Sequence, residues 1–124
     1  MFTLDEMDQM LDEIADAFPR ELFNHLNGGI ILKPEVKLNP VGKNQDLYIL
    51  GEYHADRILG RYITIYYGSM ASIYGHLSRP QMLEKLTKTL KHEFRHHLES
   101  LAGDKSLEIK DKQYLEDYMR RNAR

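Results

Sequence analysis

The chain contains no cysteine and no apolar run long enough to cross a membrane. Without cysteine neither a disulfide nor a cysteine zinc site can form, so any metal ion must be bound by histidines and carboxylates. No stretch approaches the ~18 apolar residues of a membrane-spanning helix, and residues 1–6 are acidic where a signal peptide requires positive charge. We therefore expect a cytoplasmic protein with no membrane partner.

An excess of positive charge is also absent. The formal net charge is -2, which argues against the basic surface of a nucleic-acid-binding protein, and the basic residues at 120–124 suit the end of a helix. Hydrophobic residues at 42% and charged residues at 29% are ordinary for a soluble globular protein. The length of 124 residues fits a single domain, residues 1–124.

Residues 92–96 read His-Glu-Phe-Arg-His and carry the spacing H-E-x-x-H. Successive helical residues turn by about 100°, so His92 and His96 lie one turn apart on one face and can bind the same zinc ion. Glu93 stands where zinc peptidases carry the carboxylate that takes a proton from the attacking water. Composition alone would produce about 0.02 such matches in a shuffled chain, so it does not account for the motif.

The motif lies in a segment that has the signals of one long helix. Ser78 and Gln81 form a capping-box pattern, and Gly103 is a typical end, which predicts a helix over residues 79–102. An apolar stripe lies opposite the motif histidines and consists of Leu83, Leu90, Phe94 and Leu101. The two histidines should therefore face a cleft, with Glu93 on the flank, where partial burial would raise its pKa.

The third metal ligand stays open. A catalytic zinc ion normally takes three protein ligands, and Glu99 shares the histidine face with a side chain that leans back toward His96. Asp104, just beyond the helix, is the alternative, and Glu108 lies further along. His97 points to the apolar side, so we expect it to pack or to donate a hydrogen bond. The other histidines are interpreted as surface or loop residues: His25, His54 and His76.

The remaining patterns predict an α+β fold. Thr3 and Glu6 form a second capping-box pattern, so a first helix should begin near Leu4. Pro19 is expected to open a short helix that runs to about Leu26. The other expected elements are strands at 30–38, 47–54 and 61–68, a loop at 39–44, a loop with one helical turn at 68–76 and a final helix at 112–121.

The last two strands should form an antiparallel hairpin in a sheet of about three strands. Alternation along residues 61–68 places Ile63 and Ile65 on a core-facing side. Tyr66 and Tyr67 could assist a reaction as hydrogen-bond donors, but we expect them to be packed with their hydroxyls exposed.

Several stretches together resemble the small bacterial zincin-like metallopeptidases, or minimal zincins. They are the acidic first helix, the Phe-Pro-x-Glu-Leu segment at 18–22, the segments 47–53 and 62–68, and the motif at 92–97. The resemblance implies an α+β fold in which the motif helix packs on a small sheet, and a zinc-dependent peptidase. It also implies that His92 and His96 are the ligands and Glu93 the catalytic carboxylate.

The chain departs from that family after the motif. Family members commonly continue as H-E-x-x-H-x-x-G-x-x-D, whereas Glu99 occupies the glycine position here and Ala102 the aspartate position. This departure leaves both Glu99 and Asp104 as candidates for the third ligand.

Three functions compete. The leading hypothesis is a zinc metallopeptidase that cleaves a peptide or protein substrate, which adds in extended form to an exposed strand at 61–68. The alternative is a catalytically weak or inactive zincin-like binding or regulatory protein whose metal is structural or absent. A metal-dependent RNA hydrolase would require a third histidine at the position of Ala102, so it is the least favoured.

Overall fold

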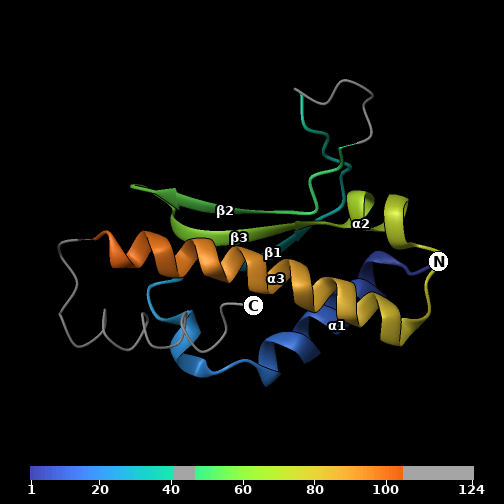
Figure 1. Cartoon of the computed structure of the whole chain (residues 1–124), viewed down its shortest axis with the longest axis horizontal. Helices are drawn as coiled ribbons and strands as arrows, with labels where there is room; N and C mark the ends of the chain where they lie inside the picture. Colours follow the sequence, from blue (N-terminus) through green and yellow to red (C-terminus); the bar gives the residue numbers. More distant parts are fainter. Residues whose placement is uncertain (41–46, 105–124) are drawn as a thin grey trace.

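The computed structural model describes residues 1–40 and 47–104. Helices and strands follow one another in an α+β arrangement (Figure 1). The elements are α1 (Leu4–Ala17), a short 3₁₀ helix η1 (Arg20–Phe23), β1 (Gly29–Lys33), β2 (Gly51–Asp56), β3 (Gly60–Tyr66), α2 (Tyr67–Tyr74) and α3 (Arg79–Ala102). The predicted helix at 112–121, Glu108 and most of the predicted loop at 39–44 lie outside the described residues.

The three strands form one mixed sheet in the order β1-β3-β2. β2 and β3 pair antiparallel, from Gly51 opposite Ile65 to Asp56 opposite Gly60, which confirms the predicted hairpin. β1 pairs parallel with the other side of β3. It ends at Lys33, before Pro34, because proline has no N–H to donate to the ladder.

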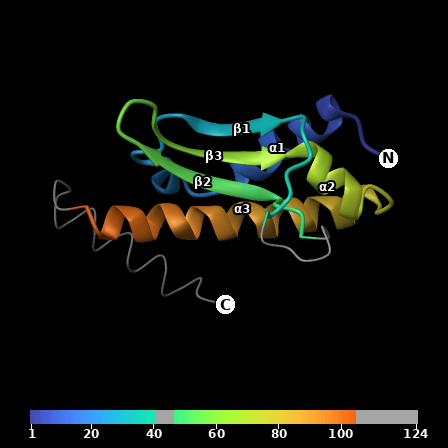
Figure 2. The same cartoon turned by 90° about the horizontal axis from the view of Figure 1, so that it is seen from above.

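The position of β3 overturns one prediction. Because β3 is hydrogen-bonded on both sides, it has no free edge to which an extended substrate could add. Within the described residues, β2 pairs with β3 alone and keeps its other edge free. This edge runs alongside α3, as Figure 2 shows. The order of strands in a sheet depends on tertiary pairing, which the alternation of residues does not reveal.

The core lies between the sheet and helices α1 and α3. The capping box at Thr3 and Glu6 is formed, and the apolar face of α1 is buried. Ile63 and Ile65 of β3 are fully buried, as predicted. The core residues are Met7, Met10, Leu11, Ile14, Leu22, Leu26, Ile63, Ile65, Met70, Met82, Leu86, Leu90, Phe94, Leu98 and Leu101.

Helix α3 has the bounds that the sequence predicts. Ser78 and Gln81 form the reciprocal capping box at its start, and Gly103 follows its last turn. Leu90, Phe94 and Leu101 are buried, whereas Leu83 is only half-buried and packs against the core from its margin. None of the helices in the described part of the chain is both long and apolar enough to span a membrane.

Two local predictions fail. η1 ends at Phe23, not near Leu26. Asn24 already leaves the helical conformation with ψ 131°, and His25 follows with a left-handed backbone at φ 64°. The segment after β3 is the 8-residue helix α2, which is longer than the one helical turn predicted within a loop. The backbone at residues 35–36 lies so close to Gly68 that a Cβ there would meet it at 2.7 Å, and Ser69 bonds to the backbone N–H of Lys37 at 2.8 Å. These tertiary contacts select the helix that local composition does not indicate.

Candidate metal and catalytic site

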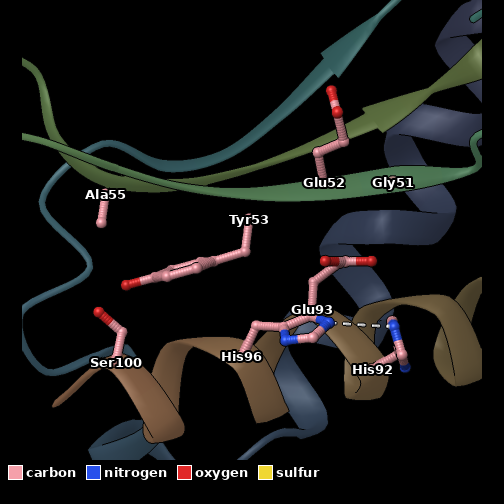
Figure 3. A pocket seen from close by; sticks show the side chains of 8 residues that line it. All are labelled: Gly51, Glu52, Tyr53, Ala55, His92, Glu93, His96 and Ser100. Atoms are coloured by element: carbon pink, nitrogen blue, oxygen red, sulfur yellow. Dashed lines mark hydrogen bonds between the residues drawn. The ribbon is translucent and has the colours of Figure 1, made fainter. Parts of the chain in front are cut away.

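A pocket of ≈ 590 Å³ lies between β2 and α3, directly over the H-E-x-x-H motif (Figure 3). It is lined by Gly51, Glu52, Tyr53, Ala55, His92, Glu93, His96 and Ser100. A second pocket of ≈ 340 Å³ shares Gly51, His92 and Glu93 with the first and extends to Lys88 and Thr89. The two pockets adjoin at these shared residues, and together they are called the groove.

The two motif histidines are placed as a chelating pair. Nε2 of His92 lies 3.2 Å from Nε2 of His96, and the rings are nearly perpendicular, at 89°. Two nitrogens bound to the same tetrahedral zinc ion at ~2.0–2.1 Å are about 3.3 Å apart, so the observed separation fits. At this distance the Nε2–H of one imidazole can also donate a hydrogen bond to Nε2 of the other. A metal ion bound to both nitrogens would replace the proton of that hydrogen bond. The residues present therefore fit two positions of a zinc site.

Glu93 lies beside this pair and is 5% exposed. Its carboxylate points into the pocket, and within the described residues it has no hydrogen bond or ion pair (Figure 3). Burial raises the pKa of Glu93 above its usual value, against the opposing charges of His92 and His96. The prediction of a flanking, partly desolvated carboxylate is confirmed. A carboxylate of this kind can accept a proton from a neighbouring water molecule.

The candidates for a third ligand do not join the pair. Glu99 Oε1 lies 3.3 Å from Nδ1 of His96, the ring nitrogen opposite the one that faces His92. Asp104 is held by Arg61 at 3.1 Å. Within residues 1–40 and 47–104, no group of three potential metal ligands is assembled. The third ligand thus stays a prediction.

No family model and no curated protein matches the chain. Its structure is similar to that of a conserved hypothetical protein from Thermus thermophilus, with a TM-score of 0.69 and 30% sequence identity. The match covers 82% of this chain and 98% of the Thermus protein. The chain belongs to the family of this Thermus protein. Because the Thermus protein is itself a conserved hypothetical protein, the function of this family member rests on its own site.

His97, which follows the second motif histidine, is fully buried. Its Nε2 lies 2.9 Å from the carbonyl oxygen of Asn24, and its Nδ1 lies 2.8 Å from the hydroxyl of Tyr53. Because a carbonyl only accepts, Nε2 carries the proton, and Nδ1 accepts from the tyrosine. Burial lowers the pKa of His97, which favours this neutral form. The prediction that His97 packs and forms hydrogen bonds is confirmed.

Tyr53 is a pocket residue that the sequence patterns did not predict. Its ring lies over α3, and its hydroxyl is committed to His97, so it is not free to donate to a substrate (Figure 3). Burial raises the pKa of Tyr53, so the hydroxyl keeps its proton. The alternation Gly51, Tyr53, Ala55 along β2 was a signal that could have placed it on the face toward α3.

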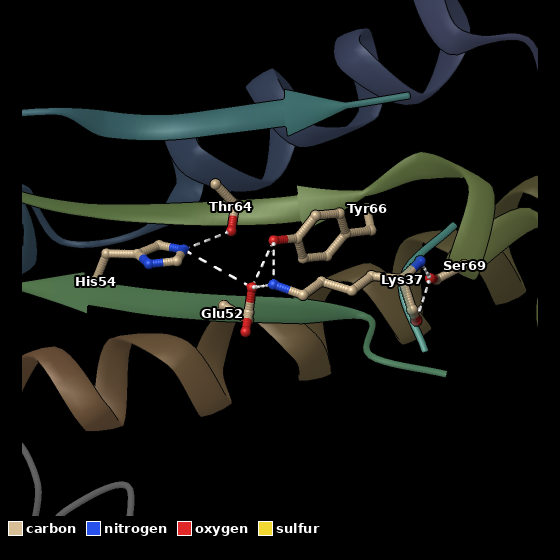
Figure 4. Close-up of polar contacts among 6 residues, drawn as sticks. All are labelled: Lys37, Glu52, His54, Thr64, Tyr66 and Ser69. Atoms are coloured by element: carbon tan, nitrogen blue, oxygen red, sulfur yellow. Dashed lines mark hydrogen bonds and ion pairs between the residues drawn. The ribbon is translucent and has the colours of Figure 1, made fainter. Parts of the chain in front are cut away.

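The two tyrosines that were candidate hydrogen-bond donors lie elsewhere. Contrary to the expected exposed hydroxyls, Tyr66 donates to Glu52 at 2.5 Å and Tyr67 donates to the carbonyl of Phe2. Neither residue lines the pocket over the motif. Tyr66 instead lies with Lys37 and the side chain of Glu52 (Figure 4).

Glu52 borders the pocket, but its side chain points away from α3 and anchors β2 on the other side of the sheet (Figures 3 and 4). It accepts from Lys37 Nζ at 2.7 Å as well as from Tyr66. Partial burial raises the pKa of Glu52, but these two hydrogen bonds outweigh it and the pKa lies below its usual value. His54 bonds to Thr64 at 3.0 Å and stacks on Tyr62. The network fixes the strand that forms one wall of the groove.

Proposed function

We propose that this protein is a zinc-dependent metallopeptidase, with His92 and His96 as two of the zinc ligands and Glu93 as the general base. One observation carries the proposal. The two Nε2 atoms lie 3.2 Å apart at the floor of a pocket, beside a buried carboxylate that has no partner in the described residues. The H-E-x-x-H spacing and its resemblance to minimal zincins support the same assignment.

The zinc ion and the side chains of the protein have different roles in the proposed reaction. A zinc ion in this site would act as a Lewis acid and lower the pKa of water. Glu93, poised by burial, takes a proton from the attacking water on a carboxylate oxygen and passes it to the nitrogen of the leaving amine. His92 and His96 would each bind the metal through the lone pair of Nε2.

The substrate binds as an extended peptide along the free edge of β2. Backbone groups on this edge are unpaired within the described residues, and β2 borders the groove that contains the motif. Addition of a strand to such an edge gives main-chain hydrogen bonds that do not depend on side chains. Lys88, at one end of the groove, favours an acidic side chain there.

The proposal is tested by measuring bound zinc and peptide cleavage in the wild type and in Glu93→Gln. The variant should keep its zinc and lose activity by about 10²–10⁴-fold, the usual contribution of a general base. Glu84→Gln is the matched control, because Glu84 lies exposed on the same helix and outside both pockets. A wild-type protein that binds no zinc, or an equally active Glu93→Gln variant, would refute the proposal.

A zincin-like binding or regulatory protein is the second candidate. The absence of a third ligand among the described residues favours it, because a metal held by two histidines alone binds weakly. This candidate predicts either no bound metal or a fully occupied coordination shell without an open position for water. It also predicts a stable protein partner whose binding is unaffected by Glu93→Gln.

A further inference from the structure

The carboxylate of Glu99 lies beside one ring nitrogen of His96. Its Oε1 lies 3.3 Å from Nδ1 of His96, while Nε2 of the same ring lies 3.2 Å from Nε2 of His92. The two residues are three apart on α3, and helical side chains lean toward the N-terminus, which brings Glu99 back over the ring. One imidazole thus has a carboxylate at one nitrogen and the other motif histidine at the opposite nitrogen.

We propose that Glu99 is a positioning residue that holds His96 in the tautomer able to bind metal, and not the third metal ligand. This inference rests on the zinc site of the proposed function. A carboxylate at Nδ1 keeps the proton on that nitrogen, so the lone pair of Nε2 is free and directed at the metal. A carboxylate partner also makes the ring a better electron donor to the metal.

The same geometry argues against direct ligation by Glu99. A ligand would have to reach the Nε2 side of the ring, where His92 lies, but the Glu99 carboxylate is on the Nδ1 side. The two motif histidines are not equivalent in this respect. Within the described residues no carboxylate lies at ion-pair distance from His92, so the positioning contact belongs to His96 alone.

The test is the zinc affinity of the full chain, measured by competition with a chromophoric chelator. Replacement of a partner that orients a metal-bound histidine typically weakens metal binding by about 10–100-fold, which we expect for Glu99→Ala. Glu99→Gln should lose less than Glu99→Ala, because the glutamine side chain can still place an oxygen atom near Nδ1, although without the negative charge. Glu84→Ala, on the same helix, should bind zinc like the wild type.

A second readout separates positioning from ligation. Cobalt substituted for zinc reports its coordination number through its visible absorption, and Glu99→Ala should keep the wild-type spectrum once saturated. A changed cobalt spectrum, together with an affinity as low as that of His96→Ala, would make Glu99 a ligand and overturn the inference. Unchanged zinc affinity in Glu99→Ala would overturn it as well.

The zinc affinity of Glu99→Ala and the activity of Glu93→Gln distinguish a failure of the positioning role from a failure of the peptidase assignment. If Glu99→Ala binds zinc normally while Glu93→Gln is inactive, the positioning inference fails and the proposed function stands. If Glu99→Ala binds zinc weakly while Glu93→Gln cleaves like the wild type, the inference stands and the proposed mechanism fails. A wild-type protein that binds neither zinc nor cobalt overturns both.

Discussion

The hydroxyl of Tyr53 and Nδ1 of His97 lie 2.8 Å apart and join β2 to α3 at the side of the pocket. His97 is fixed in turn by the carbonyl of Asn24, so three separate segments of the chain meet at one buried imidazole. This contact sets the distance between the strand that forms the wall of the groove and the helix that carries the motif.

Tyr53→Phe should therefore destabilise the fold. The substitution leaves Nδ1 of the buried His97 without its donor, and a buried polar group left unsatisfied costs about 1–3 kcal/mol. The measurement is the free energy of unfolding in urea. Tyr62→Phe is the control, because its hydroxyl has no hydrogen bond among the described residues. Equal stability of the two variants would contradict the role assigned to the Tyr53 hydroxyl.

Gly51 permits the close approach of β2 and α3. A Cβ at this position would meet Ile65 Cδ1 at 3.0 Å and Thr89 Cγ2 at 3.2 Å. Gly51→Ala should force strand and helix apart, with a loss of about 1–3 kcal/mol in the free energy of unfolding. Gly103→Ala is the matched control, since a Cβ there meets nothing closer than 3.7 Å. Equal stability of Gly51→Ala and Gly103→Ala would contradict the conclusion that Gly51 permits the close approach of β2 and α3.

Acidification should lower the stability that the hydrogen bonds of Glu52 to Lys37 and Tyr66 contribute. The pKa of Glu52 is lowered in the folded protein, so the unfolded chain binds more protons and stability rises with pH in this range. The contribution is present above the ordinary carboxyl pKa of 4.5 and is lost as the pH falls through and below that value. Glu52→Gln should be less stable at neutral pH and lose less on acidification. Urea unfolding between about pH 3 and pH 7 measures this, and parallel curves for variant and wild type would exclude it.

The charge at one end of the groove should affect substrate choice. Lys88 lines the smaller pocket, whereas Lys91 is exposed on the same helix and lines neither pocket. For peptides with an acidic residue at that end, Lys88→Glu should lower kcat/KM by up to about five-fold, the range of a partly exposed ion pair. Neutral peptides should be cleaved as before, and Lys91→Glu should change neither. Equal effects of the two substitutions would point to net charge and not to a contact in the groove.

Local patterns predicted the motif helix and the arrangement of its side chains closely. The bounds of α3 follow from a capping box at one end and a glycine at the other, both of which act within one turn. The proximity of His92 and His96 follows from helical geometry, which no tertiary contact has to supply. The burial of His97 followed from its place on the helical wheel.

Long-range contacts decided what these patterns could not predict. The helix after β3 depends on a close contact between Gly68 and residues 35–36. Tyr53 became a pocket residue only because β2 took the edge of the sheet beside α3. The short 3₁₀ helix is followed by a non-helical Asn24 and a left-handed His25, and the side chain of histidine does not indicate that conformation.

The sequence by itself determined an α+β protein with a capped helix that presents two histidines and a glutamate in H-E-x-x-H spacing, because each of these features arises from residues within a few turns of one another. Only the tertiary structure decided that β3 is central, that the edge of β2 is free, and that Glu99 faces the far nitrogen of His96. Strand order and side-chain direction depend on which distant segments pack together. A pattern along the chain does not reveal that packing.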